Sequence, residues 1–158
     1  MKFKSYLYGA YGSNLNMHQM KYRCPSAQPV GKLELKGWQL VFRSVADIQH
    51  KKDASVPIGL WLITDKCEQA LDRYEGYPTL YTKQTIRVPK LKKEFDTDRV
   101  MIYTMRDRYT VIPPNTQYLS SITQGYADFG IDVQPLTEAV GNSYLEERYE
   151  PKPKLRLL

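Results

Sequence analysis

The sequence has few of the residues that build metal centres or covalent active sites. Its 158 residues include only two cysteines and two histidines, at spacings unlike those of a metal ligand set. It has neither a Walker motif nor a Gly-x-Gly-x-x-Gly fingerprint, so nothing supports a nucleotide phosphate site. Because Cys67 falls on the buried face of a predicted helix, we expect Cys24 and Cys67 to be reduced, unpaired thiols in a cytoplasmic protein.

Long apolar segments and strongly clustered charge are also lacking. No apolar stretch approaches the length of a membrane span, and residues 1–5 lead towards a strand without the apolar core of a signal peptide. The net charge is +6, but a scattered basic surplus is typical of a solvated surface, so we expect neither a specific nucleic acid nor a membrane as partner. The basic residues cluster only at Lys90, Lys92 and Lys93 and at Lys152, Lys154 and Arg156.

What is present is an ordinary globular composition rich in tyrosine. Hydrophobic residues make up 42% and charged residues 25% of the chain, which has 13 tyrosines against four phenylalanines. Tyrosine keeps a hydroxyl close to buried surface, as a polar pocket or a half-buried sheet requires. The length fits one domain, which we place at residues 1–149, with a mobile basic tail at 150–158.

The order of the predicted elements indicates the fold class. Strand patterns and helix patterns do not alternate, which favours an α+β fold with a mostly antiparallel or mixed sheet, curled into a small barrel. A glycine turn or bulge is expected at Gly37, an edge position or sharp bend at Pro57 and Gly59, and a loop at residues 47–55. The predicted strands are 6–11, 31–44, 56–64, 81–89 and 100–105, and the predicted helices begin near residues 16, 65, 115 and 135.

The helix predicted near residue 65 carries the first candidate functional residue. Asp65 with Glu68 reads as a capping box, and Gly76 as the residue that ends the helix. Glu75 therefore stands in the last turn, where the negative end of the helix dipole should raise its pKa. Two interpretations remain open from this stretch: a solvated surface glutamate, or a carboxyl tuned towards neutrality for proton transfer.

The turn after the first strand is the second candidate. Gly12-Ser13-Asn14-Leu15 leads into a helix that Asn16 is expected to cap. Backbone N–H groups at such a turn can hold an anion, although most turns of this composition are only turns. The last helix should begin at Pro135 and turn Leu136, Val140, Tyr144 and Leu145 inward.

Three motifs together resemble the γ-glutamylcyclotransferase family, whose AIG2-like relatives share its fold. They are Tyr11-Gly12-Ser13-Asn14-Leu15, then Leu71-Asp72-x-x-Glu75-Gly76 with Tyr81 six residues after the glutamate, and Pro113-Pro114-x-x-x-Tyr118. The resemblance extends from about Tyr6 to Leu136 and includes Arg23-Cys24-Pro25. It implies a barrel of five or six strands flanked by helices, with an active-site cavity at its mouth.

The resemblance also implies a reaction that needs no cofactor and no metal. The α-amine of a γ-glutamyl amide attacks its own γ-carbonyl, forming 5-oxoproline and expelling an amine or amino acid. Glu75 would be the general base and then the general acid, a double role that suits a carboxyl of raised pKa. Tyr11, Gly12, Ser13, Asn14, Leu15, Tyr81 and Tyr118 would bind the substrate.

Alternatives stay open at this point. The two pocket tyrosines could be core residues, and the same fold could serve a non-catalytic protein that binds a small metabolite. The substrate could be a γ-glutamyl amino acid or a γ-glutamylamine, whereas a role specific to glutathione is disfavoured because such relatives differ at Asn14. We expect a monomer or a homodimer.

Overall fold

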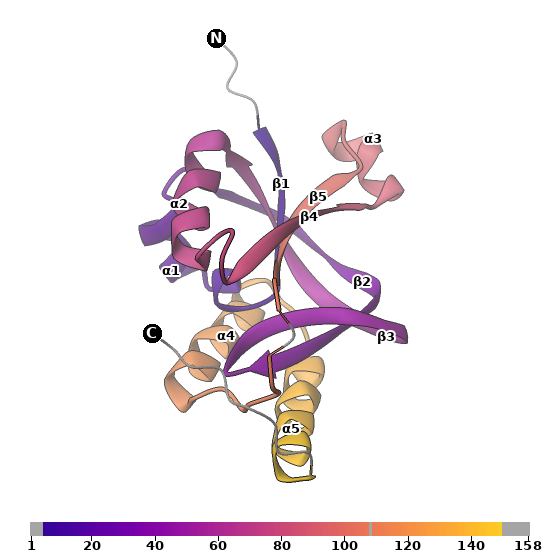
Figure 1. Cartoon of the computed structure of the whole chain (residues 1–158). Helices are drawn as coiled ribbons and strands as arrows, with labels where there is room; N and C mark the ends of the chain where they lie inside the picture. Colours follow the sequence, from indigo (N-terminus) through magenta and orange to yellow (C-terminus); the bar gives the residue numbers. More distant parts are fainter. Residues whose placement is uncertain (1–4, 108, 150–158) are drawn as a thin grey trace.

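A five-stranded sheet with the order β2-β3-β1-β5-β4 forms the centre of the computed structural model, which describes residues 5–107 and 109–149 (Figure 1). β1 pairs antiparallel with β3 and parallel with β5, so the sheet is mixed. The strands are β1 Ser5–Ala10, β2 Gln28–Arg43, β3 Val45–Thr64, β4 Tyr81–Arg87 and β5 Arg99–Met105.

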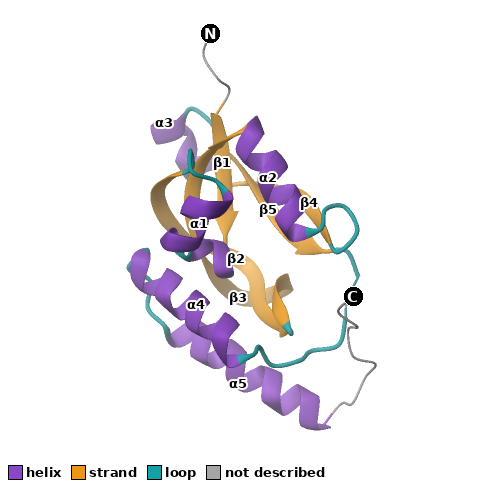
Figure 2. Ribbon diagram, turned by 90° about the vertical axis from the view of Figure 1, so that its left-hand side faces the viewer, coloured by secondary structure: helices purple, strands orange, loops and turns teal. Residues whose placement is uncertain are grey.

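Helices surround this sheet on several sides (Figure 2). In both overall views α4 and α5 lie at the same end of the molecule, below the β2–β3 hairpin, and α3 lies at the other end. α4 contacts η1, and α5 contacts β2. The helices are η1 Ser13–Leu15, α1 Met17–Arg23, α2 Asp65–Glu75, η2 Pro89–Leu91, α3 Lys92–Phe95, α4 Thr116–Asp128 and α5 Gln134–Tyr149.

The predicted α+β class and the mixed sheet are confirmed, and β4 and β5 form the antiparallel hairpin that their alternating patterns indicate. The barrel needs a correction. The sheet curls, but within the described residues its end strands β2 and β4 do not pair with each other, so it stays open. None of the helices in the described residues is long and apolar enough to cross a membrane.

The prediction of a loop at residues 47–55 is wrong. β3 runs through it as a strand, because its backbone pairs with β2 from Arg43↔Val45 as far as Trp38↔His50. The register resumes at Lys36↔Ser55, so residues 51–54 bulge opposite Gly37, where a turn or bulge was predicted. Pairing between strands, which the local composition does not reveal, holds this polar segment in the sheet.

Pro57 lies at an edge of the sheet only locally, because β3 is otherwise an inner strand. β3 lies between β2 and β1, but its pairing with β1 begins only at Gly59. Pro57 therefore has a partner strand on one side only, which suits a residue without an N–H.

Most helix ends follow the predicted chemistry. The Asn16 side chain caps α1 and the Asn115 side chain caps α4, each accepting a hydrogen bond from a backbone N–H three residues on. Gly76 ends α2 with φ 65°. The α2 cap is a correction, because the Thr64 hydroxyl rather than Asp65 accepts from the Cys67 N–H.

Two further expectations about side chains are overturned. Cys24 and Cys67 form a disulfide, with Cα atoms 5.3 Å apart. The fold brings the end of α1 and the first turn of α2 together, and the disulfide joins them. Tyr144 and Leu145 are 59% and 56% exposed, because α5 turns only one narrow face towards β2. The predicted basic tail at 150–158 lies outside the described residues.

Close packing around Leu15 fixes the turn that follows β1. Leu15 is fully buried, and a Cβ at Gly125 of α4 would lie 2.5 Å from the Leu15 Cβ. A Cβ at Gly59 of β3 would lie 2.7 Å from a Leu15 methyl group. The two glycines let a helix and a strand approach Leu15 closely, which holds η1 in place.

Candidate active site

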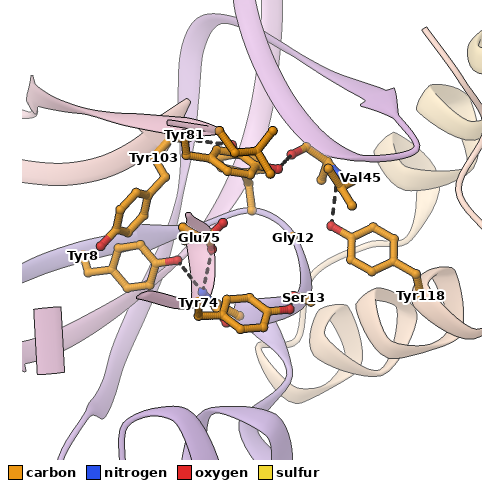
Figure 3. Close-up of a pocket in the computed structure, with 13 residues that line it drawn as sticks. Tyr8, Gly12, Ser13, Val45, Tyr74, Glu75, Tyr81, Tyr103 and Tyr118 are labelled. Atoms are coloured by element: carbon orange, nitrogen blue, oxygen red, sulfur yellow. Dashed lines mark hydrogen bonds between the residues drawn. The ribbon is translucent and has the colours of Figure 1, made fainter. Parts of the chain in front are cut away.

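A cavity of about 190 Å³ lies where the turn after β1, the C-terminal end of α2, and residues of β3, β4, β5 and α4 meet (Figure 3). Seven of the eight residues that the sequence singled out line it: Tyr11, Gly12, Ser13, Asn14, Glu75, Tyr81 and Tyr118. The eighth, Leu15, does not. Its side chain lies in the core and its N–H donates to the Gly12 carbonyl over 3.0 Å.

Asn14 connects the turn to Glu75. Its side-chain Nδ2 donates to the Tyr8 hydroxyl over 2.9 Å and to Glu75 Oε1 over 3.1 Å, which uses both amide hydrogens. Its Oδ1 accepts from Nη1 of Arg23, and its backbone carbonyl accepts from the Trp61 indole N–H over 3.0 Å. Every polar group of the side chain is engaged, so the amide has one orientation and holds one carboxylate oxygen.

Glu75 is set up to change protonation state near neutral pH. It is partly buried at the last position of α2, and burial raises its pKa from 4.5 to about 7, against a lowering by the positive charge of Arg23. The direction agrees with the expectation, but the main cause is desolvation and not the helix dipole from which the shift was expected. Within the described residues Oε2 has no hydrogen-bond partner, which leaves this oxygen available to a ligand.

Tyr81 and Tyr118, which Figure 3 shows on the two sides of Val45, both bond to the backbone of the next residue, Ala46. The Tyr81 hydroxyl donates to the Ala46 carbonyl over 2.6 Å, whereas the Tyr118 hydroxyl accepts from the Ala46 N–H over 3.0 Å. The Tyr81 proton is therefore committed, whereas among the described residues the Tyr118 proton has no acceptor and is available to a ligand. Burial raises the pKa of both groups, which keeps them protonated at neutral pH.

Counting donated and accepted hydrogen bonds also distinguishes Tyr8 of β1 from Tyr11, which follows that strand. Tyr11 donates its proton to the Tyr103 carbonyl over 2.7 Å. Tyr8 accepts from Asn14, so its own proton is free, and burial raises its pKa as well. Within the described residues Tyr8 and Tyr118 thus each keep a hydroxyl proton to donate into the cavity, and so does one of Ser13 and Tyr74, whose hydroxyls share one hydrogen bond over 3.2 Å.

The turn itself presents backbone to the cavity. A Cβ at Gly12 would lie 3.2 Å from the Ala46 Cβ and 3.3 Å from the Tyr118 hydroxyl, so only glycine leaves this wall open. Within the described residues no acceptor is found for the backbone N–H groups of Ser13 and Asn14. Unpaired N–H groups at the wall of a cavity are donors for an anion or an oxyanion.

Sequence reasoning missed several residues of the site. Tyr8 and Tyr103 stack edge to face with ring centroids 5.8 Å apart, which depends on the parallel register of β1 and β5. Tyr74 carries the Arg23 guanidinium 3.5 Å above its ring. Of these residues only Arg23 belongs to a motif that the sequence analysis singled out, Arg-Cys-Pro, and that motif did not indicate a role for it in the site. The remaining residues of the cavity wall are Val45, Ala46 and Leu80.

A partly buried carboxyl of raised pKa, opposite a glycine turn and within a polar cavity, is typical of a small-molecule active site. The family model described as gamma-glutamyl cyclotransferase, AIG2-like, matches residues 8–125. The chain belongs to this family, which confirms the resemblance seen in the motifs. A search of the curated proteins by sequence found no match.

Solved structures show the same fold. A structure described as gamma-glutamyl cyclotransferase has a TM-score of 0.71 at 22% identity, over 98% of this chain and 94% of that one. A human protein described as uncharacterised has a TM-score of 0.70 at 22% identity, over 98% and 93%. YkqA from Bacillus subtilis has a TM-score of 0.69 at 18% identity, over 96% of this chain and 56% of that one.

Proposed function

We propose that the protein is a γ-glutamyl cyclotransferase that converts a γ-glutamyl amide to 5-oxoproline, with Glu75 as general base and acid. One observation carries the proposal. The Glu75 carboxyl, with its pKa raised to about 7, faces the turn at Gly12–Asn14 across one cavity of about 190 Å³. Such a cavity takes a molecule of amino-acid size.

The reaction moves two protons from the attacking nitrogen to the leaving one, and one such carboxyl can carry them in turn. The substrate α-ammonium first gives a proton to the Glu75 carboxylate, and the resulting amine attacks the γ-carbonyl carbon. The leaving nitrogen takes this proton from the Glu75 carboxylic acid as its bond to the γ-carbon breaks. The restored carboxylate takes the second proton from the attacking nitrogen, which becomes the lactam N–H, and passes it to the released amine. A pKa near 7 keeps both the base form and the acid form accessible at neutral pH.

The remaining groups suit the charges of this substrate. The unpaired N–H groups of Ser13 and Asn14 and the free hydroxyl protons of Tyr8 and Tyr118 can stabilise the oxyanion or bind the substrate α-carboxylate. The nucleophile belongs to the substrate, so the protein has to hold the glutamyl chain folded and exclude competing contacts. Holding reacting groups together in this way contributes much of the rate of intramolecular reactions.

The test is product formation by the purified protein. We expect 5-oxoproline from at least one member of a panel of γ-glutamyl amides, and a loss of about 10²- to 10⁴-fold in kcat/KM with Glu75→Gln, the range for one acid–base group. Gln can still accept the Asn14 hydrogen bond, so the variant removes the titrating group with little other change. Product at the same rate from the variant would refute the role of Glu75. Tight, stoichiometric binding without turnover would favour a metabolite-binding protein instead.

A further inference from the structure

A second cavity, of about 240 Å³, adjoins the one that contains Glu75. Ser13, Tyr74 and Tyr118 line both cavities, so the two spaces meet at these residues. The N-terminal part of α4 also contributes Gln117 and Ser121 to the second cavity. A substrate bound beside Glu75 would therefore have this second space next to it.

The second cavity contains one positive charge and, among its lining residues, no acidic group. The charge is Arg23, which forms no ion pair with any carboxylate in the described part of the chain. Its Nη1 donates to Ser13 Oγ over 3.1 Å and to the Asn14 side chain, and its Nη2 donates to the Tyr74 hydroxyl over 2.6 Å.

These bonds leave part of the guanidinium available. Of its five N–H groups, three have acceptors, and the Nε–H and one N–H of Nη2 have none among the described residues. Nε and Nη2 lie on one edge of the guanidinium. The two unpaired N–H groups are charged donors that a carboxylate can accept from.

Two other polar groups of this cavity also lack partners. Gln19 Oε1 and Ser121 Oγ are buried and have no hydrogen-bond partner within the described residues. Buried polar atoms are nearly always paired in folded proteins, so each unpaired one calls for a partner. Both residues line the second cavity, so its wall contains polar groups that the described fold leaves unpaired.

We propose that this second cavity is the subsite for the leaving group, and that Arg23 selects a leaving group with a carboxylate. The inference rests on the proposed function and narrows its substrate class: an amino acid is expelled in preference to a simple amine. Neither Gln19 nor Ser121 lines the cavity of Glu75, and among the described residues neither is hydrogen-bonded to it, so both can be changed with the acid–base group in place.

The test uses two substrates that differ only in this carboxylate, γ-glutamyl-alanine and γ-glutamyl-ethylamide. With the unmodified protein we expect kcat/KM to be about 10- to 100-fold higher for the alanine substrate, the range for a hydrogen-bonded charge pair. Arg23→Gln should bring this ratio close to one. Arg23 also holds Asn14, so both rates can fall, but a merely structural effect lowers them together and leaves the ratio unchanged.

Gln19→Glu gives an independent variant. It places a negative charge in the same cavity and should lower the ratio at least tenfold, mainly through a higher KM for the alanine substrate. The backbone of Gln19 keeps its bond to the Asn16 cap, so the fold should be retained. The matched control is Gln69→Glu, the same exchange at an exposed position of α2, which should leave the ratio unchanged.

The outcomes separate the two proposals. A ratio within about threefold of one in the unmodified protein, or a ratio that neither Arg23→Gln nor Gln19→Glu changes, overturns the subsite and leaves the cyclotransferase activity standing. Absence of 5-oxoproline from every γ-glutamyl amide overturns both.

Discussion

Replacing Glu75 with Gln should make the protein more stable at alkaline pH while it removes activity. Burial holds the pKa of this carboxyl at about 7 against 4.5 outside the fold. The native state therefore keeps a proton between these values that the unfolded chain has already lost. Stability from this group is fully present below about pH 4.5, and it is lost as the pH rises through about 7.

The size of this loss follows from the shift. A rise of about 2.5 pH units, at about 1.4 kcal/mol for each unit, gives about 3 kcal/mol that the ionised Glu75 costs the fold above pH 7. This is an upper value, because the side chain is partly exposed and the Asn14 amide can donate to the carboxylate. The glutamine side chain of the Glu75→Gln variant has no charge to desolvate, so the variant escapes the loss.

The assay is urea unfolding of both proteins at pH 5 and at pH 8.5, followed by fluorescence. The free energy of unfolding should differ little at pH 5 and by up to about 3 kcal/mol in favour of Glu75→Gln at pH 8.5. Glu34→Gln, at an exposed position of β2, is the matched control and should show no such pH dependence. Equal differences at both pH values would refute the raised pKa. In the activity assay, kcat/KM of the unmodified protein should fall about tenfold for each pH unit below about 7.

Other predictions concern the groups around this carboxyl. Tyr118→Phe removes the free hydroxyl donor and should lower kcat/KM about tenfold or more; an unchanged value would exclude this hydroxyl from the reaction. The unreduced protein should contain no free thiol in a colorimetric titration, and replacing Cys24 and Cys67 by Ser should cost about 4 kcal/mol of unfolding free energy for their separation of 43 residues. Two reactive thiols in that titration would contradict the bond. Gly125→Ala should lower the unfolding free energy by about 2 kcal/mol, although Ala normally stabilises a helix, because its Cβ would lie 2.5 Å from the Leu15 Cβ. An increase in the unfolding free energy of Gly125→Ala would show that Leu15 can move aside at little cost, and would contradict this prediction.

Features decided by a few neighbouring residues could be predicted from the sequence. The Asn16 and Asn115 caps and the helix end at Gly76 each depend on a side chain or glycine within one turn. The choice of Thr64 over Asp65 as the α2 cap shows the limit of such reasoning, because adjacent residues offer the same chemistry and only the path of the chain selects one.

Features that depend on distant segments could not be predicted in this way. The polar residues 47–55 read as a loop because their partners in β2 are identified only by the register of a long hairpin. The disulfide needs α1 and α2 side by side, which no spacing between Cys24 and Cys67 indicates. Tyr8 reaches the cavity because β1 lies between β3 and β5.

Glu75 combines a feature that depends on neighbouring residues with one that depends on distant segments. The position of Glu75 in the last turn of its helix is local and could be inferred from the sequence. The predicted direction of its pKa shift is right, but the prediction rests on the helix dipole, whereas burial is the main cause. The value near 7 is a balance between burial by the walls of the cavity and the opposing charge of Arg23 on a helix some fifty residues earlier. Asn14 touches both charged groups, donating to the carboxylate and accepting from the guanidinium. The acid–base group and the proposed selector of the leaving group are thus linked through one amide, and a change at Arg23 should act on rate and on substrate choice by separate routes.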